Sequence, residues 1–334
     1  MQAMRLEEPG PIEKSPLVPR RVDRPEPGAG QVRVRIRTCA ICRTDLHVIE
    51  ADLPTVKLPL TPGHQVVGIV DKFGPGCERL QMGQRIGFGW LRHTDGRCRY
   101  CRRGLENLCP ASRYTGYHED GGYAEYAVVG EAYVYELPES YDDVAAAPLL
   151  CAGLIGYRAL ERAVVPDRGR LLLAGFGSSA HIVIQLALHR GHELYVLSRS
   201  AAHRGLARQM GAVWAGEDLT ALPRKMDSII LFAPVGHLVP PLLEALAPGG
   251  TLSIAGIHLS DIPGPLLYEK HLFHEKQVRS VTANTRQDGR NLLAEAAQAG
   301  VRPQTTTYPL ADANRALKDI KHSQLPGTGV LVMP

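Results

Sequence analysis

The sequence predicts an α/β protein with two domains, a β-rich domain and a domain built on a doubly wound parallel sheet. At 334 residues the chain exceeds one typical domain, which favours two hydrophobic cores. Short β-prone runs broken by Gly and Pro fill roughly the first 150 residues. After residue 170, apolar strand-like runs alternate with helical stretches, a pattern typical of a parallel sheet covered by helices on both faces.

The elements of the β-rich part are expected to be short and irregular. Strand-like runs lie at residues 31–37, 65–73, 84–89 and 123–129. Such runs, separated by turn-forming residues, predict an antiparallel β domain.

The second part is expected to alternate strands with helices. Strands are predicted at 171–174, 193–198, 228–233 and 251–255, and helices at 182–189, 202–210 and 239–246. Beyond residue 284, two helices at 291–299 and 311–322 and a strand at 329–333 are expected to rejoin the first domain. The predicted domains are therefore 1–152 with 285–334, and 153–284.

Composition and charge exclude several classes of function. The hydrophobic content of 44% and charged content of 22% fit a soluble globular protein. The net charge is +4 and the basic residues are dispersed, so no nucleic acid or membrane partner is expected. The longest apolar-leaning stretch, 144–157, is interrupted by Pro and Gly, and residues 1–11 lack the apolar core of a signal peptide. A cytoplasmic location is predicted.

Cysteine usage favours metal binding or thiol chemistry. An odd number of cysteines, in a chain with no evident export signal, argues against a disulfide framework. The seven are Cys39, Cys42, Cys77, Cys98, Cys101, Cys109 and Cys151.

A glycine-rich turn is predicted to bind a dinucleotide. The strand at 170–174 runs into a G-x-G-x-x-A sequence and then a helix, which is the context that this fingerprint requires. Pyrophosphate would lie on free N–H groups at the positive end of the helix dipole. The alternative is a purely structural turn. The residues concerned are Gly175, Gly177, Ser178, Ser179 and Ala180.

The end of the next strand favours NADP(H) over NAD(H). It reads Ser198-Arg199, with Arg204 following, and after Glu193 no carboxylate occurs until Glu217. A hydroxyl and guanidinium groups suit a 2′-phosphate, which a carboxylate would repel. The alternative is that Arg199 is a solvated loop residue.

Three residues are candidate ligands of a catalytic zinc ion. Cys42, His64 and Cys151 supply three ligands and leave an open fourth position, as catalytic zinc requires. They are far apart in sequence, and each could instead be a buried core residue.

Four segments in a fixed order resemble the zinc-containing medium-chain alcohol dehydrogenases over essentially the whole chain. They are C-x-x-C-R-T-D-x-H at 39–47, G-H-Q-x-x-G at 63–68, C-A-G at 151–153 and the glycine-rich turn. The resemblance implies a GroES-like catalytic domain and a Rossmann cofactor domain. It also implies a homodimer or homotetramer.

The resemblance assigns roles to individual residues. Cys42, His64 and Cys151 would bind the catalytic zinc ion. Thr44 would hydrogen-bond the substrate oxygen, and His47 would pass the alcohol proton to solvent. Asp45 would orient the zinc-binding histidine.

Departures from the family pattern occur at both metal sites. Gln65 stands where many relatives have Glu, which argues against transient metal binding by this side chain.

The structural zinc lobe reads C-x-x-C-x-x-C-x7-C in the family, and here Asp95 replaces its first cysteine. Zinc accepts carboxylate oxygen, so the set remains chemically acceptable. The lobe ligands would be Asp95, Cys98, Cys101 and Cys109.

Three further residues match family positions at the substrate and nicotinamide sites. Trp90 resembles a residue that lines the substrate cleft, and Leu53 is a second candidate; either could instead be core packing. Ile257 follows a predicted strand where relatives contact nicotinamide. The family's late Arg, which often binds pyrophosphate, has no counterpart at 326–329.

These features imply reversible hydride transfer between a small alcohol and its aldehyde or ketone, with a nicotinamide cofactor and Zn²⁺. The sequence does not identify the substrate. Alternatives are an aldehyde reductase, a polyol dehydrogenase or a zinc-free quinone or alkene reductase on the same scaffold. A non-catalytic zinc- and nucleotide-binding sensor is the alternative from another class. Retention of Cys151, where polyol dehydrogenases commonly have Glu, and of Thr44 with His47 favours the alcohol dehydrogenase.

Overall fold

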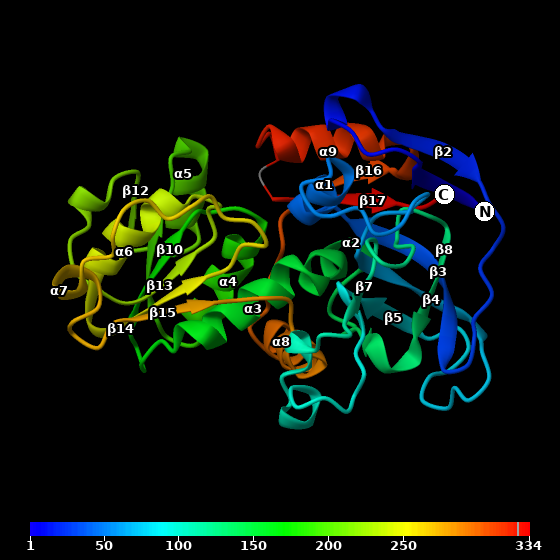
Figure 1. Ribbon diagram of the computed structural model, residues 1–334, viewed down its shortest axis with the longest axis horizontal. Coiled ribbons are helices and arrows are strands. Elements are labelled where there is room, and N and C mark those ends of the chain that lie inside the picture. Colours follow the sequence, from blue (N-terminus) through cyan, green and yellow to red (C-terminus); the bar gives the residue numbers. More distant parts are fainter. Residues whose placement is uncertain (326) are drawn as a thin grey trace. The chain divides into compact units, whose positions relative to one another are not determined.

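The computed structural model describes residues 1–325 and 327–334, which form two compact units (Figure 1). Unit 1 comprises Met1–Ala152, Ala283–Ala297 and Arg302–Pro334, and unit 2 comprises Gly153–Thr282 and Gln298–Val301. Unit 1 is rich in β-strands and unit 2 contains a parallel sheet, which confirms the predicted α/β fold class.

Unit 1 is organised around a seven-stranded sheet. Its order is β16-β17-β3-β4-β5-β9, with β8 also paired to β3, and all pairs are antiparallel except β16 with β17. The strands are β3 (Gln31–Ala40), β4 (Gln65–Phe73), β5 (Arg85–Phe88), β8 (Tyr126–Gly130), β9 (Val134–Glu136), β16 (Thr305–Pro309) and β17 (Thr328–Val332). In β3, Val32, Val34 and Ile36 are buried and alternate with Arg residues, as expected for a strand with one face on the core.

Short elements complete unit 1. Two small ribbons pair β1 (Gln2–Leu6) with β2 (Leu17–Arg21), and β6 (Leu91–His93) with β7 (Arg113–Tyr114). The helices are α1 (Arg43–Ile49), α2 (Asp143–Ala146), α8 (Arg286–Gln298, whose last residue belongs to unit 2) and α9 (Ala313–Lys321). One hydrophobic cluster extends from β1 through β3 and β4 to α9.

Unit 2 is a doubly wound parallel sheet of six strands. Its order is β12-β11-β10-β13-β14-β15, so the first strand in the chain lies at the centre and the order reverses beside it. The strands are β10 (Arg170–Ala174), β11 (Glu193–Leu197), β12 (Trp214–Gly216), β13 (Met226–Leu231), β14 (Leu246–Ile254) and β15 (Gln277–Ser280). β10 is buried on both faces, as a central strand covered by helices must be.

Helices follow most strands of unit 2. They are α4 (Ser178–His189), α5 (Ala201–Gln209), α6 (Val239–Ala245) and α7 (Tyr268–His271), whereas α3 (Ala152–Ala163, whose first residue belongs to unit 1) precedes β10. Among the described residues no single helix is long and apolar enough to cross a membrane. Two helical segments, Asp143–Leu150 and Ala152–Ala163, are long and apolar enough only when they are taken together, and the chain bends by 45° between them.

Candidate active site

The N-terminus of α1 fixes the first candidate ligand. Cys42 is the N-cap residue, and its backbone N–H donates to Asp45 Oδ2 at 2.9 Å. The Cys42 side chain in turn accepts from the backbone of Asp45, which completes a reciprocal capping box. The local sequence therefore sets both the start of the helix and the position of the Cys42 sulfur.

Cys42, His64 and Cys151 converge in unit 1. Their ligand atoms all lie within 4.8 Å of one another, and His64 Nε2 is 3.2 Å from Cys151 Sγ. His64 is fully buried, whereas both cysteines are partly exposed, so the cluster has an accessible side. Two thiols and an imidazole with such a side fit a zinc ion that keeps one position for substrate.

Asp45 and Tyr123 form a chain of hydrogen bonds that ends at the Nδ1 atom of His64. His64 Nδ1 is 2.8 Å from Asp45 Oδ1, which leaves Nε2 for a metal. The Tyr123 hydroxyl donates to Asp45 Oδ2 at 2.9 Å. All three side chains are buried. Tyr123 was not predicted, because no local motif links it to Asp45.

The electrostatics of the cluster favour a cation. Burial opposes protonation of His64, but Asp45 and Cys42 raise its pKa to about 10. A hydrogen bond between the two cysteines lowers the pKa of Cys42 well below its usual range, and the same bond raises that of Cys151. Negative charge on Asp45 and Cys42 thus accumulates where the zinc ligands meet.

Thr44 and His47 lie on α1 at a spacing that places both on one helix face. Thr44 Oγ1 is 3.6 Å from Cys42 Sγ, so its hydroxyl lies beside the candidate metal site. His47 Nδ1 is 2.8 Å from Asp52 Oδ2. Asp52 is a further candidate residue that the sequence reasoning did not single out.

A group of aromatic rings lies beside His64. The Trp90 ring lies edge-on to His64 with centroids 5.0 Å apart, and it stacks with Tyr114 at 4.8 Å and Tyr117 at 5.9 Å. Trp90 therefore lies beside the predicted zinc ligands. The Tyr117 hydroxyl donates to Pro54 O at 2.7 Å, next to Leu53. Neither tyrosine was predicted, because their relation to Trp90 depends on the β6–β7 ribbon.

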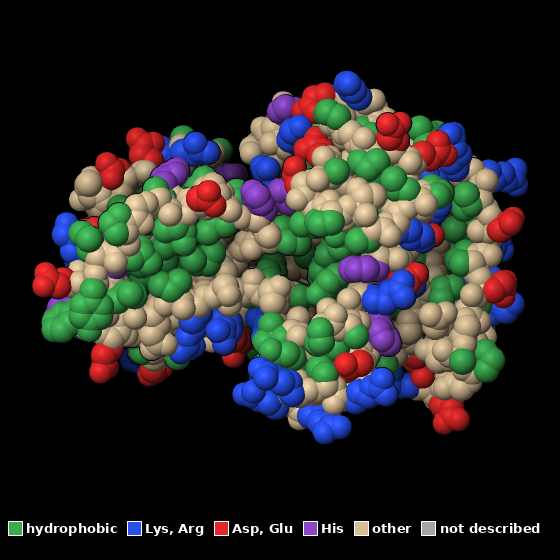
Figure 2. Space-filling model, in the orientation of Figure 1, with side chains coloured by type: hydrophobic (Ala, Val, Ile, Leu, Met, Phe, Trp, Pro, Cys, Tyr) green, Lys and Arg blue, Asp and Glu red, His purple; other side chains and the backbone are tan. Residues whose placement is uncertain are grey.

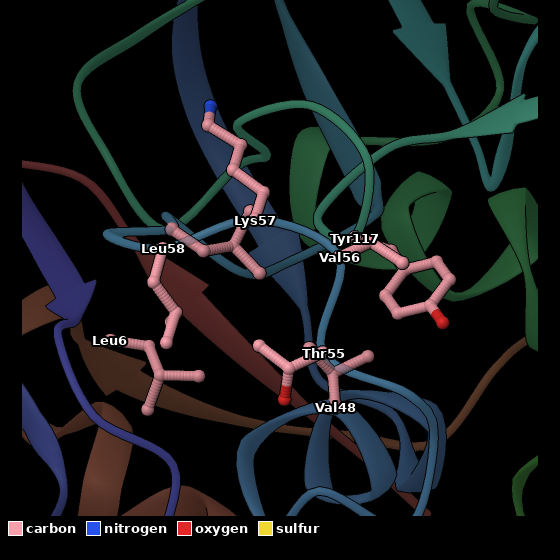
Figure 3. Close-up of a pocket in the computed structure, with 8 residues that line it drawn as sticks. Leu6, Val48, Thr55, Val56, Lys57, Leu58 and Tyr117 are labelled. Atoms are coloured by element: carbon pink, nitrogen blue, oxygen red, sulfur yellow. The ribbon is translucent and has the colours of Figure 1, made fainter.

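A small apolar hollow lies under the segment that follows Leu53 (Figure 3). Figure 3 shows Leu6 and Leu58 pointing toward one another across it, while the Lys57 amine points away. Its volume is about 10 Å³, close to the space of a single water molecule. The hollow is too small for a substrate.

The second candidate ligand set forms a lobe. Ligand atoms of Asp95, Cys98, Cys101 and Cys109 lie within 4.8 Å of one another. Asp95 Oδ1 accepts from the backbone N–H groups of Arg97 and Cys98, both at 2.9 Å, and these bonds hold its pKa well below the usual range. Asp95 is therefore a carboxylate that faces three thiols, a donor set that zinc accepts.

The surface of this lobe is strongly basic. Figure 2 shows Lys and Arg side chains gathered along the lower edge of the view, where the lobe and α8 lie in Figure 1. The exposed arginines of the lobe are Arg97, Arg99, Arg102 and Arg103.

In unit 2 the glycine-rich turn joins β10 to α4. Gly175 adopts φ +97°, and a Cβ there would lie 2.8 Å from Ala233 N, so only glycine fits. Gly177 is the N-cap of α4, and a Cβ there would meet nothing within 4 Å. The backbone at the helix N-terminus is thus open to a ligand. Ala180 is fully buried and allows close packing of α4; the predicted Ser178 and Ser179 form the first turn of that helix.

A carboxylate that the sequence interpretation set aside lies close to Arg204, beyond the end of β11. Glu217 follows β12, the strand paired with β11, and its Oε2 lies 3.0 Å from Arg204 Nη1. The same nitrogen donates to the carbonyls of Ser198 and Arg199, both at 2.8 Å. Arg204 is therefore already engaged, whereas the Arg199 side chain is exposed. Parallel pairing of the two strands was the signal that could have placed Glu217 here.

Ile257 lies in an irregular segment after β14, and its side chain is half exposed. The structure therefore places it at the carboxyl-end side of the parallel sheet, where ligands of doubly wound sheets bind.

Comparison with known proteins places these features in a family context. Residues 28–139 match the family model described as the alcohol dehydrogenase GroES-like domain. The whole chain is 50% identical to the probable alcohol dehydrogenase AdhA of Mycobacterium tuberculosis, of which 97% is covered.

Solved structures agree with this match. A cinnamyl alcohol dehydrogenase of Sorghum bicolor is similar with a TM-score of 0.90 and 26% identity, over 99% of this chain and 97% of that one. A thermostable alcohol dehydrogenase from Pyrobaculum aerophilum, described as cobalt- and zinc-bound, is similar with a TM-score of 0.88 and 25% identity, over 99% of each chain.

Proposed function

This chain belongs to the medium-chain alcohol dehydrogenase family and is an alcohol dehydrogenase, and we propose that its catalysis depends on zinc held by Cys42, His64 and Cys151. The proposal is carried by the convergence of these three ligand atoms within 4.8 Å, on an accessible side, with Asp45 behind the histidine. Zinc bound there would act as a Lewis acid toward the substrate oxygen.

The protein's own residues would bind the alcohol and remove its proton. The Thr44 hydroxyl lies beside Cys42 and would accept the proton of the substrate hydroxyl in a hydrogen bond. His47, one helical turn later, would pass that proton to water, and Asp52 would orient its imidazole. Trp90 and Leu53 would line the substrate pocket, with Tyr114 and Tyr117 holding the Trp90 ring.

A nicotinamide cofactor would bind unit 2 and accept the hydride. The open turn at Gly175 and Gly177 supports pyrophosphate binding at the N-terminus of α4. Within this site we propose a preference for NADP(H), carried by Ser198 and the exposed Arg199 at the end of β11. Arg204 would shape this corner through its bonds to two carbonyls.

Metal analysis together with activity tests the zinc proposal. Purified protein should oxidise a primary alcohol with NADP⁺ or NAD⁺, and chelation of zinc should abolish this activity. Cys42→Ala should remove both the activity and one zinc ion per chain. Full activity after complete zinc removal, or in Cys42→Ala, would refute the zinc mechanism.

Cofactor selectivity is tested by Arg199→Asp. Loss of the guanidinium and gain of a carboxylate should reverse the preference toward NAD(H). An unchanged ratio of kcat/KM for the two cofactors would refute the assignment of Arg199.

Location and assembly complete the proposal. Seven free cysteines, several of them candidate metal ligands, suit the reducing cytoplasm. The proposed assembly is a homodimer or homotetramer, which light scattering of the purified protein tests. A panel of primary alcohols, secondary alcohols and aldehydes would identify the substrate and the preferred direction.

A further inference from the structure

Gln65 lies next to the candidate zinc ligands without being one of them. It follows His64 directly and is the first residue of β4. Its side chain is buried, with 1% of its surface exposed. A buried amide must satisfy both a donor and an acceptor, so its partners reveal its role.

Both polar atoms of Gln65 bond to backbone groups beside the other two ligands. Nε2 donates to Ile41 O at 3.1 Å, and Ile41 immediately precedes Cys42. Oε1 accepts from Ala152 N–H at 3.3 Å, and Ala152 immediately follows Cys151. One side chain thereby joins the three chain segments that carry Cys42, His64 and Cys151.

The two partners also fix the orientation of the amide. A carbonyl oxygen needs a donor and a backbone N–H needs an acceptor, so Nε2 must face Ile41 and Oε1 must face Ala152. Both polar atoms of Gln65 are thus engaged with backbone groups. A glutamate here could still accept from Ala152, but its carboxylate would oppose the Ile41 carbonyl without a proton between them.

We propose that Gln65 is a positioning residue that holds the three ligand segments in the arrangement that a zinc ion requires. This inference rests on the proposed zinc site. Groups that orient metal ligands typically change metal affinity by about 10- to 100-fold when they are removed. Gln65 acts through the backbone next to the ligands, so its loss should weaken metal retention and alter ligand geometry.

Two substitutions separate the parts of this role. Gln65→Met keeps the approximate length of the side chain and removes both hydrogen bonds. Gln65→Glu keeps the acceptor and removes the donor. The exposed Gln81→Glu adds the same charge elsewhere in unit 1 and serves as the control.

The experiment measures zinc release from the folded protein to a chromogenic chelator. The release phase that is missing in Cys151→Ser belongs to the Cys42–His64–Cys151 site, which separates it from the lobe. The d–d absorption bands of the Co²⁺-substituted protein that are missing in Cys151→Ser report the geometry of the same ligands. Thermal unfolding of each variant is recorded in parallel.

We expect this phase to be about 10- to 100-fold faster in Gln65→Met and Gln65→Glu, with shifted cobalt bands, and unchanged in Gln81→Glu. If Gln65→Glu does not fold, Gln65→Met alone carries the test. Wild-type release rates and cobalt bands in Gln65→Met would overturn the inference, even if its melting temperature falls. Slower release in Gln65→Glu would also overturn it, because the side chain would then act as a ligand. A wild-type protein without any phase that Cys151→Ser removes would instead refute the proposed zinc site.

Discussion

Asp45 is hydrogen-bonded by three groups that lie far apart in sequence. Its carboxylate is bonded to His64 Nδ1 and accepts from the Cys42 N–H and the Tyr123 hydroxyl. A buried carboxylate is stable only when its oxygens are satisfied, so each of these donors contributes to the site. His64 and Cys42 are themselves candidate zinc ligands. Tyr123 is not a ligand, so its hydroxyl can be removed without removing a metal ligand.

Tyr123→Phe should lower the free energy of unfolding by about 2 kcal/mol, because a buried hydrogen bond to a charged group is lost. Chemical denaturation of the zinc-loaded protein measures this difference. The matched control is Tyr141→Phe, whose buried hydroxyl donates to the neutral carbonyl of Ala296 at 2.7 Å. The control should lose about 1 kcal/mol and keep wild-type zinc release. Equal losses in the two variants would contradict a special role for Tyr123.

Near the end of β11, Arg204 and Glu217 carry opposite charges and form an ion pair. Glu217 lies 3.0 Å from Arg204, so it neutralises one of the two guanidinium groups near the predicted 2′-phosphate site. A carboxylate at this corner also repels a phosphate dianion.

Glu217→Gln should therefore increase the preference for NADP(H). The ratio of kcat/KM for NADP⁺ to that for NAD⁺ should rise by about three- to tenfold, which corresponds to about 1 kcal/mol. Glu193→Gln, at the opposite end of β11, should leave the ratio unchanged. A fall in the ratio for Glu217→Gln would show that Glu217 assists NADP(H) binding.

Among the elements, α4 combines the glycine turn with a buried histidine. His181 lies in the first half of this helix and is 1% exposed. Burial lowers the pKa of His181 to about 4, and neighbouring His203 contributes in the same direction. The folded state thus binds a proton at His181 less tightly than the unfolded chain does.

The free energy of unfolding should fall as the pH drops from the pKa of His181 in the unfolded chain toward its pKa in the folded protein. A histidine in an unfolded chain has a pKa of about 6.5, so the contribution of His181 is complete above that pH and is lost progressively toward about pH 4. His181→Gln should reduce this loss, as measured by urea denaturation at about pH 7.5 and about pH 5.5. The exposed His189→Gln should retain the wild-type pH dependence. The same acid sensitivity in all three proteins would contradict the assignment.

The elements differ in how well the sequence predicts them. The predicted strand 65–73 matches β4 because its apolar residues pack on both sides of the sheet. The strand predicted at 123–129 begins only at Tyr126, because the backbone of residues 123–125 hydrogen-bonds to β1. β16 was not predicted: its sequence TTTYP has a single buried residue and lies at the edge of the sheet.

The residues of the site also differ in how well the sequence predicts them. The resemblance to the family predicted Cys42, His64 and Cys151 as ligands, and their ligand atoms lie within 4.8 Å of one another. The resemblance could not predict Gln65 as the residue that joins their segments, or Glu217 as the partner of Arg204. The Gln65 relation joins segments that meet only in three dimensions, whereas the Glu217 relation follows from the parallel pairing of β11 with β12.

At the scale of the whole molecule, unit 1 contains two candidate metal sites of different composition. The lobe has one carboxylate among three thiols, and zinc prefers thiolate in structural sites. The identity of residue 95 should therefore determine how firmly the lobe retains its ion.

Asp95→Cys should increase the zinc that remains after dialysis against a chelator, and it should raise the melting temperature. Asp95→Ser should lose the lobe ion and melt earlier, because the fourth ligand is removed. Zinc analysis and calorimetry of the three proteins test this order. Retention in Asp95→Ser equal to the wild type would exclude Asp95 as a ligand.

The two ligand sets also differ in the length of chain that each encloses. The lobe draws all its ligands from Asp95 to Cys109, whereas the other set extends from Cys42 to Cys151 and includes the 87-residue separation of His64 from Cys151. Closing a short loop costs less conformational entropy than closing long ones. As the chain leaves the ribosome, the lobe would therefore be able to bind a zinc ion before the rest of unit 1 has folded. The proposed catalytic ligands would meet only after β3 and β4 have paired and Cys151 has been synthesised, so zinc supply late in folding would limit how many molecules become active.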